Sequence, residues 1–328
     1  MKLLLIRFSS IGDIVLTTPV IRCAKQQANN GDVEIHYLTK RKYQSILQPN
    51  PHIDRLITID KSVSEVADQL KATNYDLIID LHNNLRSRHV KMLLSAPSHT
   101  FKKLSFKKWL YATFKWNLLP EVHVVDRYMD TVKSLNVTND DQGLDFFITA
   151  EDALDKSTLP ATHQQGFIGF VIGGQHQGKL YPTDMVAQAC RLLDKPVILL
   201  GGPEDRERAE LITEAAGGKV YNACGKYSLN QSASLVRDAE CVITNDTGLM
   251  HIAAALKKRV ISIWGATVPE FGMYPYLPGP GSKILEPAKE CDRPYSKLGN
   301  KVFYKPAYHC WKGLEPEVVA AAALATEE

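Results

Sequence analysis

A strand, a polar turn and an alanine-rich helix follow one another without a break over residues 241–256. The β-branched run at 241–244 predicts a buried strand, and the helix can begin at Gly248. Asp246 or Thr247 is placed to cap that helix, whose free N–H groups and positive dipole end form an anion site. An ordinary capped helix packed by apolar side chains would show the same pattern. The segment favours a sheet that holds a nucleotide diphosphate at its carboxyl edge.

Short apolar strands alternate with helical segments in both halves of the chain. We expect strands at residues 2–6, 33–38, 56–59, 77–81, 167–172, 197–200, 241–244 and 260–264. This rhythm predicts an α/β protein with two Rossmann-like doubly wound domains. We expect an N-terminal domain over 1–150, a linker over 151–165, a C-terminal domain over 166–314, and a final helix over 315–328 that can pack back on the N-terminal domain.

The composition is that of an ordinary soluble protein, with 328 residues, 45% apolar and 23% charged side chains. The net charge of +3 is too small to indicate a nucleic-acid partner by itself. Six cysteines without a C-x-x-C pair favour a reduced, cytoplasmic protein, although Cys291 and Cys310 could approach each other. The amino-terminal apolar run is shorter than the ~7–15 residues of a signal core. No stretch approaches the ~20 apolar residues of a membrane span, so we expect a soluble or peripheral protein.

The first predicted strand is followed by Arg7-Phe8-Ser9-Ser10-Ile11-Gly12-Asp13, which is not the dinucleotide fingerprint G-x-G-x-x-G. Gly12 permits a tight turn, and Asp13 stands where the strand passes into a helix. A carboxylate at this edge can accept a proton from a bound hydroxyl. It can also simply stabilise the positive end of a helix, so this motif alone leaves both roles open.

A glycine-rich turn at residues 173–180 nearly spells a Walker A loop. Leu180 replaces the Ser/Thr that would bind Mg²⁺, and Lys179 precedes the helix, so we exclude a P-loop NTPase. Gly173 and Gly174 can still wrap a phosphate beside the charge of Lys179, although a flexible loop with a solvated lysine is an alternative. Glu204, after the next strand, can accept hydrogen bonds from a ribose diol or complement a helix dipole.

Residues 81–120 contain no acidic side chain, and aromatic residues are interleaved among the basic ones. The basic residues are Arg86, Arg88, Lys91, Lys102, Lys103, Lys107, Lys108 and Lys115. Such a segment suits an anionic membrane surface, and single-stranded nucleic acid would use the same residue types. A solvated amphipathic helix is the plain alternative, but the long acid-free interval favours an anionic ligand. No Asp-x-Asp pair or His/Cys cluster with metal spacing appears near a strand end, so we expect no metal and no cofactor.

Together these motifs resemble the ADP-heptose:lipopolysaccharide heptosyltransferases of glycosyltransferase family 9. The resemblance rests on five segments: residues 7–19, with Asp13; residues 80–87; Lys179-Leu180-Tyr181-Pro182; residues 245–256; and Gly265-Ala266-Thr267. The chain departs from the family pattern in two places. It keeps only Cys291 and Cys310 where a cysteine-rich stretch is often found, and it has His82-Asn83-Asn84 where Gln-Gly is common.

The resemblance implies a GT-B fold, with the two domains facing a central cleft, and a metal-independent, inverting transfer from an ADP-sugar. Asp13 would deprotonate the acceptor hydroxyl, and Lys179 would neutralise the departing diphosphate. The donor side would comprise Gly173, Gly174, Glu204, Asp246, Thr247, Gly248, Leu249 and His251. The acceptor side would comprise Ser10, Gly12, Asn84, Arg86, Ser87, Lys102 and Lys103.

The implied partners are ADP-heptose, an anionic Kdo–lipid A-type acceptor and the inner face of the cytoplasmic membrane, where the protein would bind peripherally. We expect no nucleic-acid partner. Two readings from other classes stay open: a nucleotide-sugar epimerase of GT-B architecture, and a nucleotide- or glycan-binding module without turnover. A basic nucleic-acid binder is a weaker option.

Overall fold

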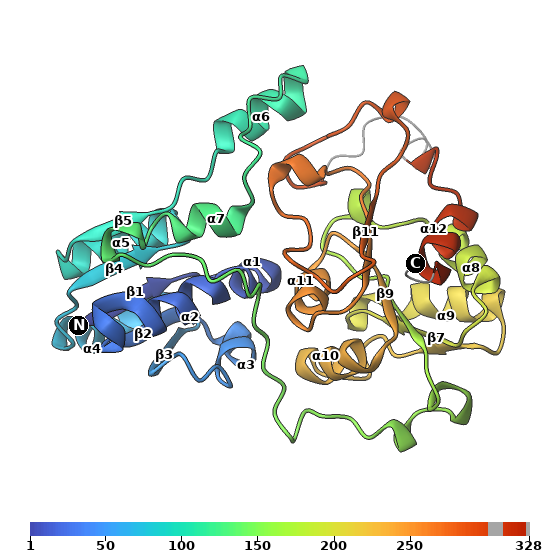
Figure 1. Cartoon of the computed structure of the whole chain (residues 1–328), viewed down its shortest axis with the longest axis horizontal. Coiled ribbons are helices and arrows are strands. Elements are labelled where there is room, and N and C mark those ends of the chain that lie inside the picture. Colours follow the sequence, from blue (N-terminus) through green and yellow to red (C-terminus); the bar gives the residue numbers. More distant parts are fainter. Residues whose placement is uncertain (301–310, 326–328) are drawn as a thin grey trace. The chain divides into compact units, whose positions relative to one another are not determined.

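The computed structural model describes residues 1–300 and 311–325, and the chain divides into two units (Figure 1). The first unit contains Met1–Lys103 and Val122–Phe147. The second contains Leu104–Glu121 and the chain from Ile148 onward. The segment 104–121 thus groups with the carboxyl-terminal unit, although in the sequence it lies between the two parts of the first unit. Among the described residues no helix is long and apolar enough to cross a bilayer.

The first unit is a parallel sheet of five strands in the order β3-β2-β1-β4-β5. Its strands are β1 (Lys2–Ile6), β2 (Glu34–Lys40), β3 (Arg55–Ile59), β4 (Leu77–Asp80) and β5 (Ser98–Thr100). Its helices are α1 (Ile11–Val15), α2 (Thr18–Gln27), α3 (Gln44–Leu47), α4 (Ala67–Ala72), α5 (Leu85–Leu94) and α7 (Val124–Met129). This is the strand order of a Rossmann half, in which ligands bind outside the carboxyl ends of the strands.

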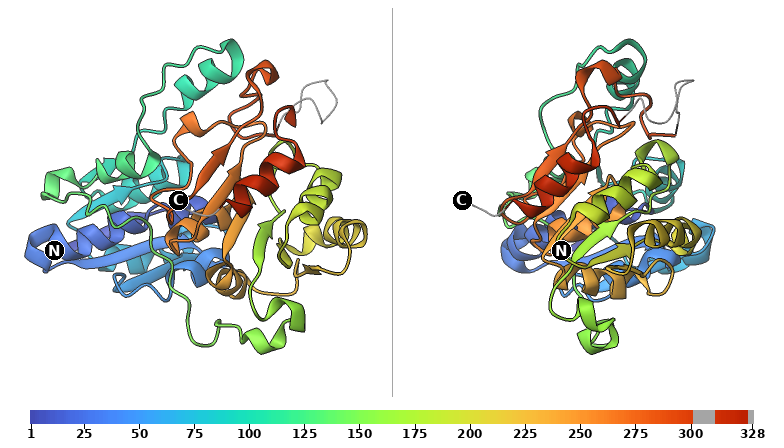
Figure 2. Two further views of the ribbon diagram at one scale, coloured as in Figure 1. Left: turned by 45° about the vertical axis from the view of Figure 1, so that its right-hand side comes forward. Right: turned by 90° about the vertical axis from the view of Figure 1, so that its right-hand side faces the viewer.

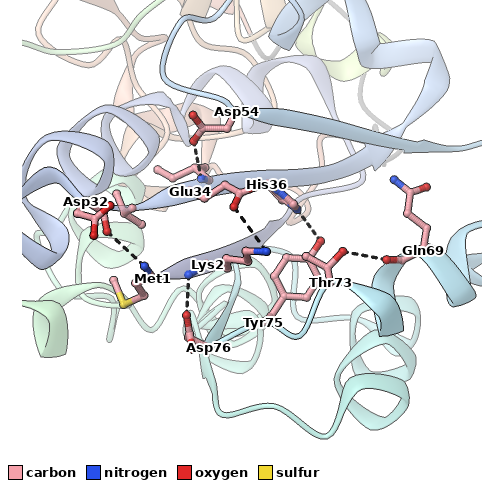
Figure 3. A network of polar contacts seen from close by, with 12 residues as sticks. Met1, Lys2, Asp32, Glu34, His36, Asp54, Gln69, Thr73, Tyr75 and Asp76 are labelled. Atoms are coloured by element: carbon pink, nitrogen blue, oxygen red, sulfur yellow. Dashed lines mark hydrogen bonds and ion pairs between the residues drawn. The ribbon is translucent and has the colours of Figure 1, made fainter.

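Polar contacts tie together the amino ends of these strands, at the edge opposite to that ligand-binding edge (Figure 3). The Lys2 amide donates to Asp76 Oδ2 at 2.7 Å, and the Ile35 amide donates to Asp54 Oδ2 at 2.7 Å. The ring of His36 is hydrogen-bonded through Nδ1 to the Tyr75 hydroxyl at 2.8 Å. Backbone groups that begin the strands are therefore satisfied by side chains from neighbouring segments.

The second unit has a six-stranded parallel sheet in the order β11-β10-β9-β6-β7-β8. Its strands are β6 (Ile168–Val171), β7 (Val197–Leu200), β8 (Val220–Asn222), β9 (Cys241–Asn245), β10 (Val260–Ile263) and β11 (Lys283–Leu285). Numbered within the unit, this is the same doubly wound order as in the first half, extended by one strand. The two-domain, doubly wound prediction is confirmed.

Helices flank the second sheet on both faces, where two separate hydrophobic clusters form (Figure 2). They are α8 (Thr183–Leu192), α9 (Arg206–Ala216), α10 (Leu229–Asp238), α11 (Gly248–Ala255) and α12 (Pro316–Leu324). Helix α12 packs on α8, and the Tyr181 hydroxyl donates to the Leu314 carbonyl at 2.5 Å just before it. Within residues 151–165, Leu159 is buried in the cluster below β6 and β7, so part of this segment packs on the second sheet.

Candidate functional site

Asp13 lies in the first turn of α1, directly after the carboxyl end of β1. Its Oδ2 accepts hydrogen bonds from the Ser10 hydroxyl at 2.6 Å and the Ser10 amide at 3.1 Å. Its Oδ1 pairs with Arg7 Nη2 at 2.6 Å. The Asp13 side chain is 21% exposed, so the ion pair does not enclose it. Gly12, beside it, is buried, and its carbonyl accepts from the Leu16 amide at 2.9 Å.

The guanidinium of Arg7 is buried and held from several sides. Its Nε donates to the Ser9 carbonyl at 2.7 Å, and its Nη1 donates to the Leu81 carbonyl at 2.5 Å. It also lies 5.8 Å from the centre of the Tyr128 ring. Burial opposes its charge, yet the adjacent Asp13 carboxylate raises the pKa of Arg7 above its usual value. Sequence reasoning missed this residue, which fixes one oxygen of Asp13.

Asp80, the last residue of β4, organises the loop that follows it. It is fully buried, and its Oδ1 accepts from the backbone amides of His82 at 3.0 Å and Asn83 at 2.7 Å. Its Oδ2 accepts from the Ser87 hydroxyl at 2.8 Å and pairs with Lys91 Nζ at 3.0 Å. A buried carboxylate with this many partners shapes the loop at the carboxyl edge of the sheet.

Two predicted acceptor residues close the amino end of α5. The Ser87 amide donates to Asn84 Oδ1, and the Asn84 amide donates to Ser87 Oγ, each at 2.9 Å. Ser87 is fully buried, so this conformation leaves it to position the loop through Asp80. Arg86 is half-buried, with its guanidinium 5.3 Å from the centre of the Phe8 ring.

Two lysines were also predicted to bind the acceptor, and both lie at the end of the segment Met1–Lys103. Lys102 is exposed, and Lys103 is half-buried. Burial and the charge of Arg7 lower the pKa of Lys103. Burial and the same guanidinium lower the pKa of His82 to about 3, and Nδ1 of this ring accepts from the Phe8 amide at 3.3 Å. Arg7, Asp13, His82 and Lys103 therefore form one electrostatically linked group.

In the second unit, three predicted motifs meet at one carboxylate. Lys179 Nζ pairs with Asp246 Oδ2 at 2.5 Å, and the Thr267 hydroxyl donates to the same oxygen at 3.0 Å. The Ala266 amide donates to the Gly178 carbonyl at 2.8 Å, which joins the two loops through their backbones. The site thus lies at the carboxyl ends of β6, β9 and β10, where a Rossmann sheet binds ligands.

Helix α11 begins beside this cluster. Thr247 is its cap, accepting through Oγ1 from the Met250 amide at 3.4 Å, whereas Asp246 is engaged with Lys179. The first helical residues are Gly248 and Leu249, whose amides belong to the orphan N–H groups of a helix end. His251 is buried one turn further along the same helix.

The glycine turn after β6 has little space for side chains. A Cβ at Gly173 would collide with the Asp205 carboxylate, and one at Gly174 would lie 2.8 Å from Leu180 Cδ2. Asp205 is buried and accepts from the Gly202 amide at 2.9 Å, and burial raises its pKa. Sequence reasoning selected Glu204, which is exposed; the glycine pair before it was the signal that could have pointed to Asp205.

The segment with the two carboxyl-terminal cysteines is described only in part. Cys291 is buried, and Cys310 lies outside the described residues. Within residues 1–300 and 311–325, no group of three or more His, Cys, Asp or Glu side chains is arranged to hold a metal ion.

A family model and a curated relative match this chain, and both are described as heptosyltransferases. A family model described as glycosyltransferase family 9 (heptosyltransferase) matches residues 63–279. Lipopolysaccharide heptosyltransferase 1 of Campylobacter coli is 28% identical over 291 residues, which cover 81% of this chain and 84% of that protein.

Solved structures agree with this match. The glycosyl transferase family 9 protein of Veillonella parvula superposes with a TM-score of 0.77 at 26% identity, covering 98% of this chain and 95% of that one. The E. coli heptosyltransferase WaaC with ADP superposes with a TM-score of 0.68 at 22% identity, covering 92% and 97% of the two chains, and shows the shared fold. The fold is therefore GT-B, and the chain belongs to glycosyltransferase family 9, the heptosyltransferases.

Proposed function

We propose that this enzyme transfers heptose from ADP-heptose to an anionic, lipid-linked acceptor of the lipopolysaccharide inner core, with inversion and without a metal ion. The names of its relatives support the sugar and the pathway. The observation that carries the proposal is the cluster of Lys179, Asp246 and Thr267 beside the capped start of α11. A positive charge next to free helix amides is suited to a diphosphate.

On the acceptor side, Asp13 is the proposed general base. Its carboxylate accepts the proton of the acceptor hydroxyl, and the oxygen forms a bond to the anomeric carbon from the face opposite the diphosphate. The bond between that carbon and the diphosphate oxygen breaks, and ADP leaves as an anion. Arg7 Nη2, 2.6 Å from Oδ1, and the Ser10 hydroxyl, 2.6 Å from Oδ2, hold this carboxylate in place.

On the donor side, Lys179 and the amides at Thr247, Gly248 and Leu249 stabilise the charge that develops on the departing diphosphate. Fixed donors aimed at a developing charge lower the barrier because they need no reorganisation. This arrangement supplies the positive charge that a divalent cation would otherwise provide, which is our reason for proposing metal independence. Asp246 positions the lysine rather than contacting the phosphate.

For the acceptor, the first unit offers Arg86, Lys102 and Lys103. Carboxylates and phosphates of a Kdo–lipid A-type glycan need such cations, and a guanidinium can bind them through two parallel hydrogen bonds. Ser10 positions the base through its hydroxyl, and Asn84 and Ser87 hold the loop that carries Arg86. These six predicted residues of the acceptor side thus receive either a contact role or a positioning role.

The proposal can be tested by incubating the protein with ADP-heptose and a Kdo–lipid A acceptor, with and without EDTA. We expect ADP release that requires the acceptor, survives EDTA, and gives a glycoside of opposite anomeric configuration to the donor. Conversion of the donor alone would identify an epimerase, and binding without turnover a non-catalytic module. In a thermal-shift panel of nucleotide sugars, a ligand at about 100 times its Kd stabilises the fold by ~2.7 kcal/mol, and we expect ADP-heptose to give the largest shift.

A further inference from the structure

Helix α6 (Ser105–Phe114) has two opposite faces, of which one is anchored to the second unit. On the anchored face, the Tyr111 ring meets Phe271 edge-on at 6.2 Å between centres, and Lys108 Nζ lies 5.2 Å from the same ring. Just past the helix, Lys115 Nζ donates to the carbonyls of Asp292 at 2.6 Å and Pro294 at 2.8 Å. The spacing 108, 111, 115 is that of one helical stripe.

The outward face carries large aromatic side chains that the protein leaves exposed. Phe106 is 68% exposed and Trp116 62%, and Trp109 and Phe114 are exposed as well. The four rings form a chain of neighbours: Phe106 and Trp109 stack at 5.8 Å, Trp109 and Phe114 meet at 5.5 Å, and Phe114 and Trp116 lie 5.5 Å apart. Contiguous exposed apolar surface of this kind marks an interaction site.

The charged residues on α6 and on the chain just before it are basic. Lys107 is exposed within the helix and Lys102 precedes it, and residues 81–120 contain no acidic side chain. We infer that the outward face of α6, made of Phe106, Trp109, Phe114 and Trp116 with Lys107, docks on an anionic phospholipid bilayer. The inference concerns where the protein binds and does not depend on which sugar it transfers.

A bilayer fits this face better than other occupants. Aromatic rings beside lysines favour the headgroup boundary, where the rings enter the apolar layer and the lysines meet lipid phosphates. The rings contact one another, and Phe106 covers one face of Trp109, whereas a single-stranded nucleic acid needs ring faces that are open to its bases. A second copy would bring lysine against lysine, which opposes pairing.

The tryptophans make the inference directly measurable. Of the four, Trp109 and Trp116 are exposed beside α6, while Trp264 and Trp311 are buried. We expect vesicles of phosphatidylcholine with phosphatidylglycerol to shift the tryptophan emission to shorter wavelength and to protect it from acrylamide. Phosphatidylcholine vesicles alone should do so much less, and added salt should reverse the effect.

Variants locate the binding face. Phe106→Ser with Trp116→Ser should weaken co-sedimentation with anionic vesicles by on the order of tenfold or more, because buried aromatic area is lost. The matched control is Leu211→Ser, at a side chain that is 61% exposed on α9. Lys107→Gln should weaken binding about fivefold, whereas Lys71→Gln on α4 should not. Turnover of a delipidated, water-soluble acceptor should be the same in all four variants.

Several outcomes would overturn the inference. Vesicle binding that survives the double substitution, or that leaves the exposed tryptophans open to acrylamide, would place the contact elsewhere. An emission shift with single-stranded RNA and none with vesicles would identify a nucleic-acid surface instead. Failure of the sugar-transfer proposal would appear separately, as absent turnover of the soluble acceptor with intact vesicle binding.

Discussion

Both units place a carboxylate–cation pair just beyond a strand end, and the two pairs are built differently. In the first, Asp13 pairs with Arg7 at 2.6 Å; in the second, Asp246 pairs with Lys179 at 2.5 Å. Arg7 is buried and also bonded to two backbone carbonyls, so it is a fixed part of the scaffold. Lys179 stands on a short glycine-rich turn, at the end of a flexible stem. In the first pair the cation is thus the part built into the fold, whereas in the second the cation is carried by a turn and held by the carboxylate.

The largest effect should come from the carboxylate that the first pair holds. Asp13→Asn keeps the shape and removes the base, so kcat should fall by about 10²–10⁴-fold while donor affinity stays the same. Steady-state turnover and calorimetric titration with an ADP-sugar measure the two quantities. Retained turnover would move the base to another residue.

Removing the fixed cation should chiefly reduce stability. Arg7→Met leaves two carbonyls and a carboxylate without their donor, and should lower the free energy of unfolding by about 3 kcal/mol. Lys179→Met should lower it less, by about 1 kcal/mol, because the Thr267 hydroxyl still donates to the Asp246 carboxylate. Urea denaturation of both variants provides the check, and equal losses would remove the distinction between the pairs.

Replacing Lys179, the cation of the second pair, should chiefly reduce donor binding. Lys179→Met should weaken ADP binding by about 10–100-fold, which corresponds to one hydrogen bond to a charged group. Calorimetry gives the affinity, with Lys71→Met as a control at an exposed lysine outside the site. Unchanged ADP affinity would show that the lysine does not meet the diphosphate.

The buried position of His82 near Arg7 should also make the stability of the fold depend on pH. Burial and Arg7 lower the pKa of His82 to about 3, so the folded state prefers the neutral ring. The unfolded chain takes up the proton near pH 6.5, and stability is lost as the pH falls from there towards 3. At pH 5 the loss should be about 2 kcal/mol relative to pH 7. His82→Asn, which can still accept from the Phe8 amide, should remove this part of the pH dependence; an identical profile would contradict it.

The smallest effect should come from the Thr267 hydroxyl, which donates to the carboxylate of the Lys179–Asp246 pair. Thr267→Val removes one hydrogen bond to Asp246 at nearly constant shape. Donor affinity should fall about fivefold or less, with stability nearly unchanged. A loss as large as that of Lys179→Met would mean that Thr267 itself contacts the donor.

The long, apolar elements could be predicted from sequence, because burial on both faces of a parallel strand produces continuous β-branched runs. Strands β5, β8 and β11 could not, since each has three residues and takes its conformation from its neighbour in the sheet. The site shows the same division. Lys179, Asp246 and Thr267 were each visible as motifs, but their meeting at one oxygen was not.

Non-local contacts explain the other omissions. Arg7 donates to the carbonyl of Leu81, which is distant in sequence, and no local sequence pattern predicts such a bond. Asp205 was hidden because its burial depends on the fold around Gly173 and Gly201. Ser87 looked like a ligand contact because a buried serine and an exposed one read alike in sequence.

The packing of α12 on α8 has a consequence for biosynthesis. Val319 and Ala320 of α12 belong to the same hydrophobic cluster as Ile168 and Phe170 of β6, the first strand of that sheet. All residues of the amino-terminal unit have been translated once Phe147 is added, so this unit can fold while the ribosome is still translating the second. The second unit must instead wait, with part of its hydrophobic cluster uncovered, until α12 has left the exit tunnel.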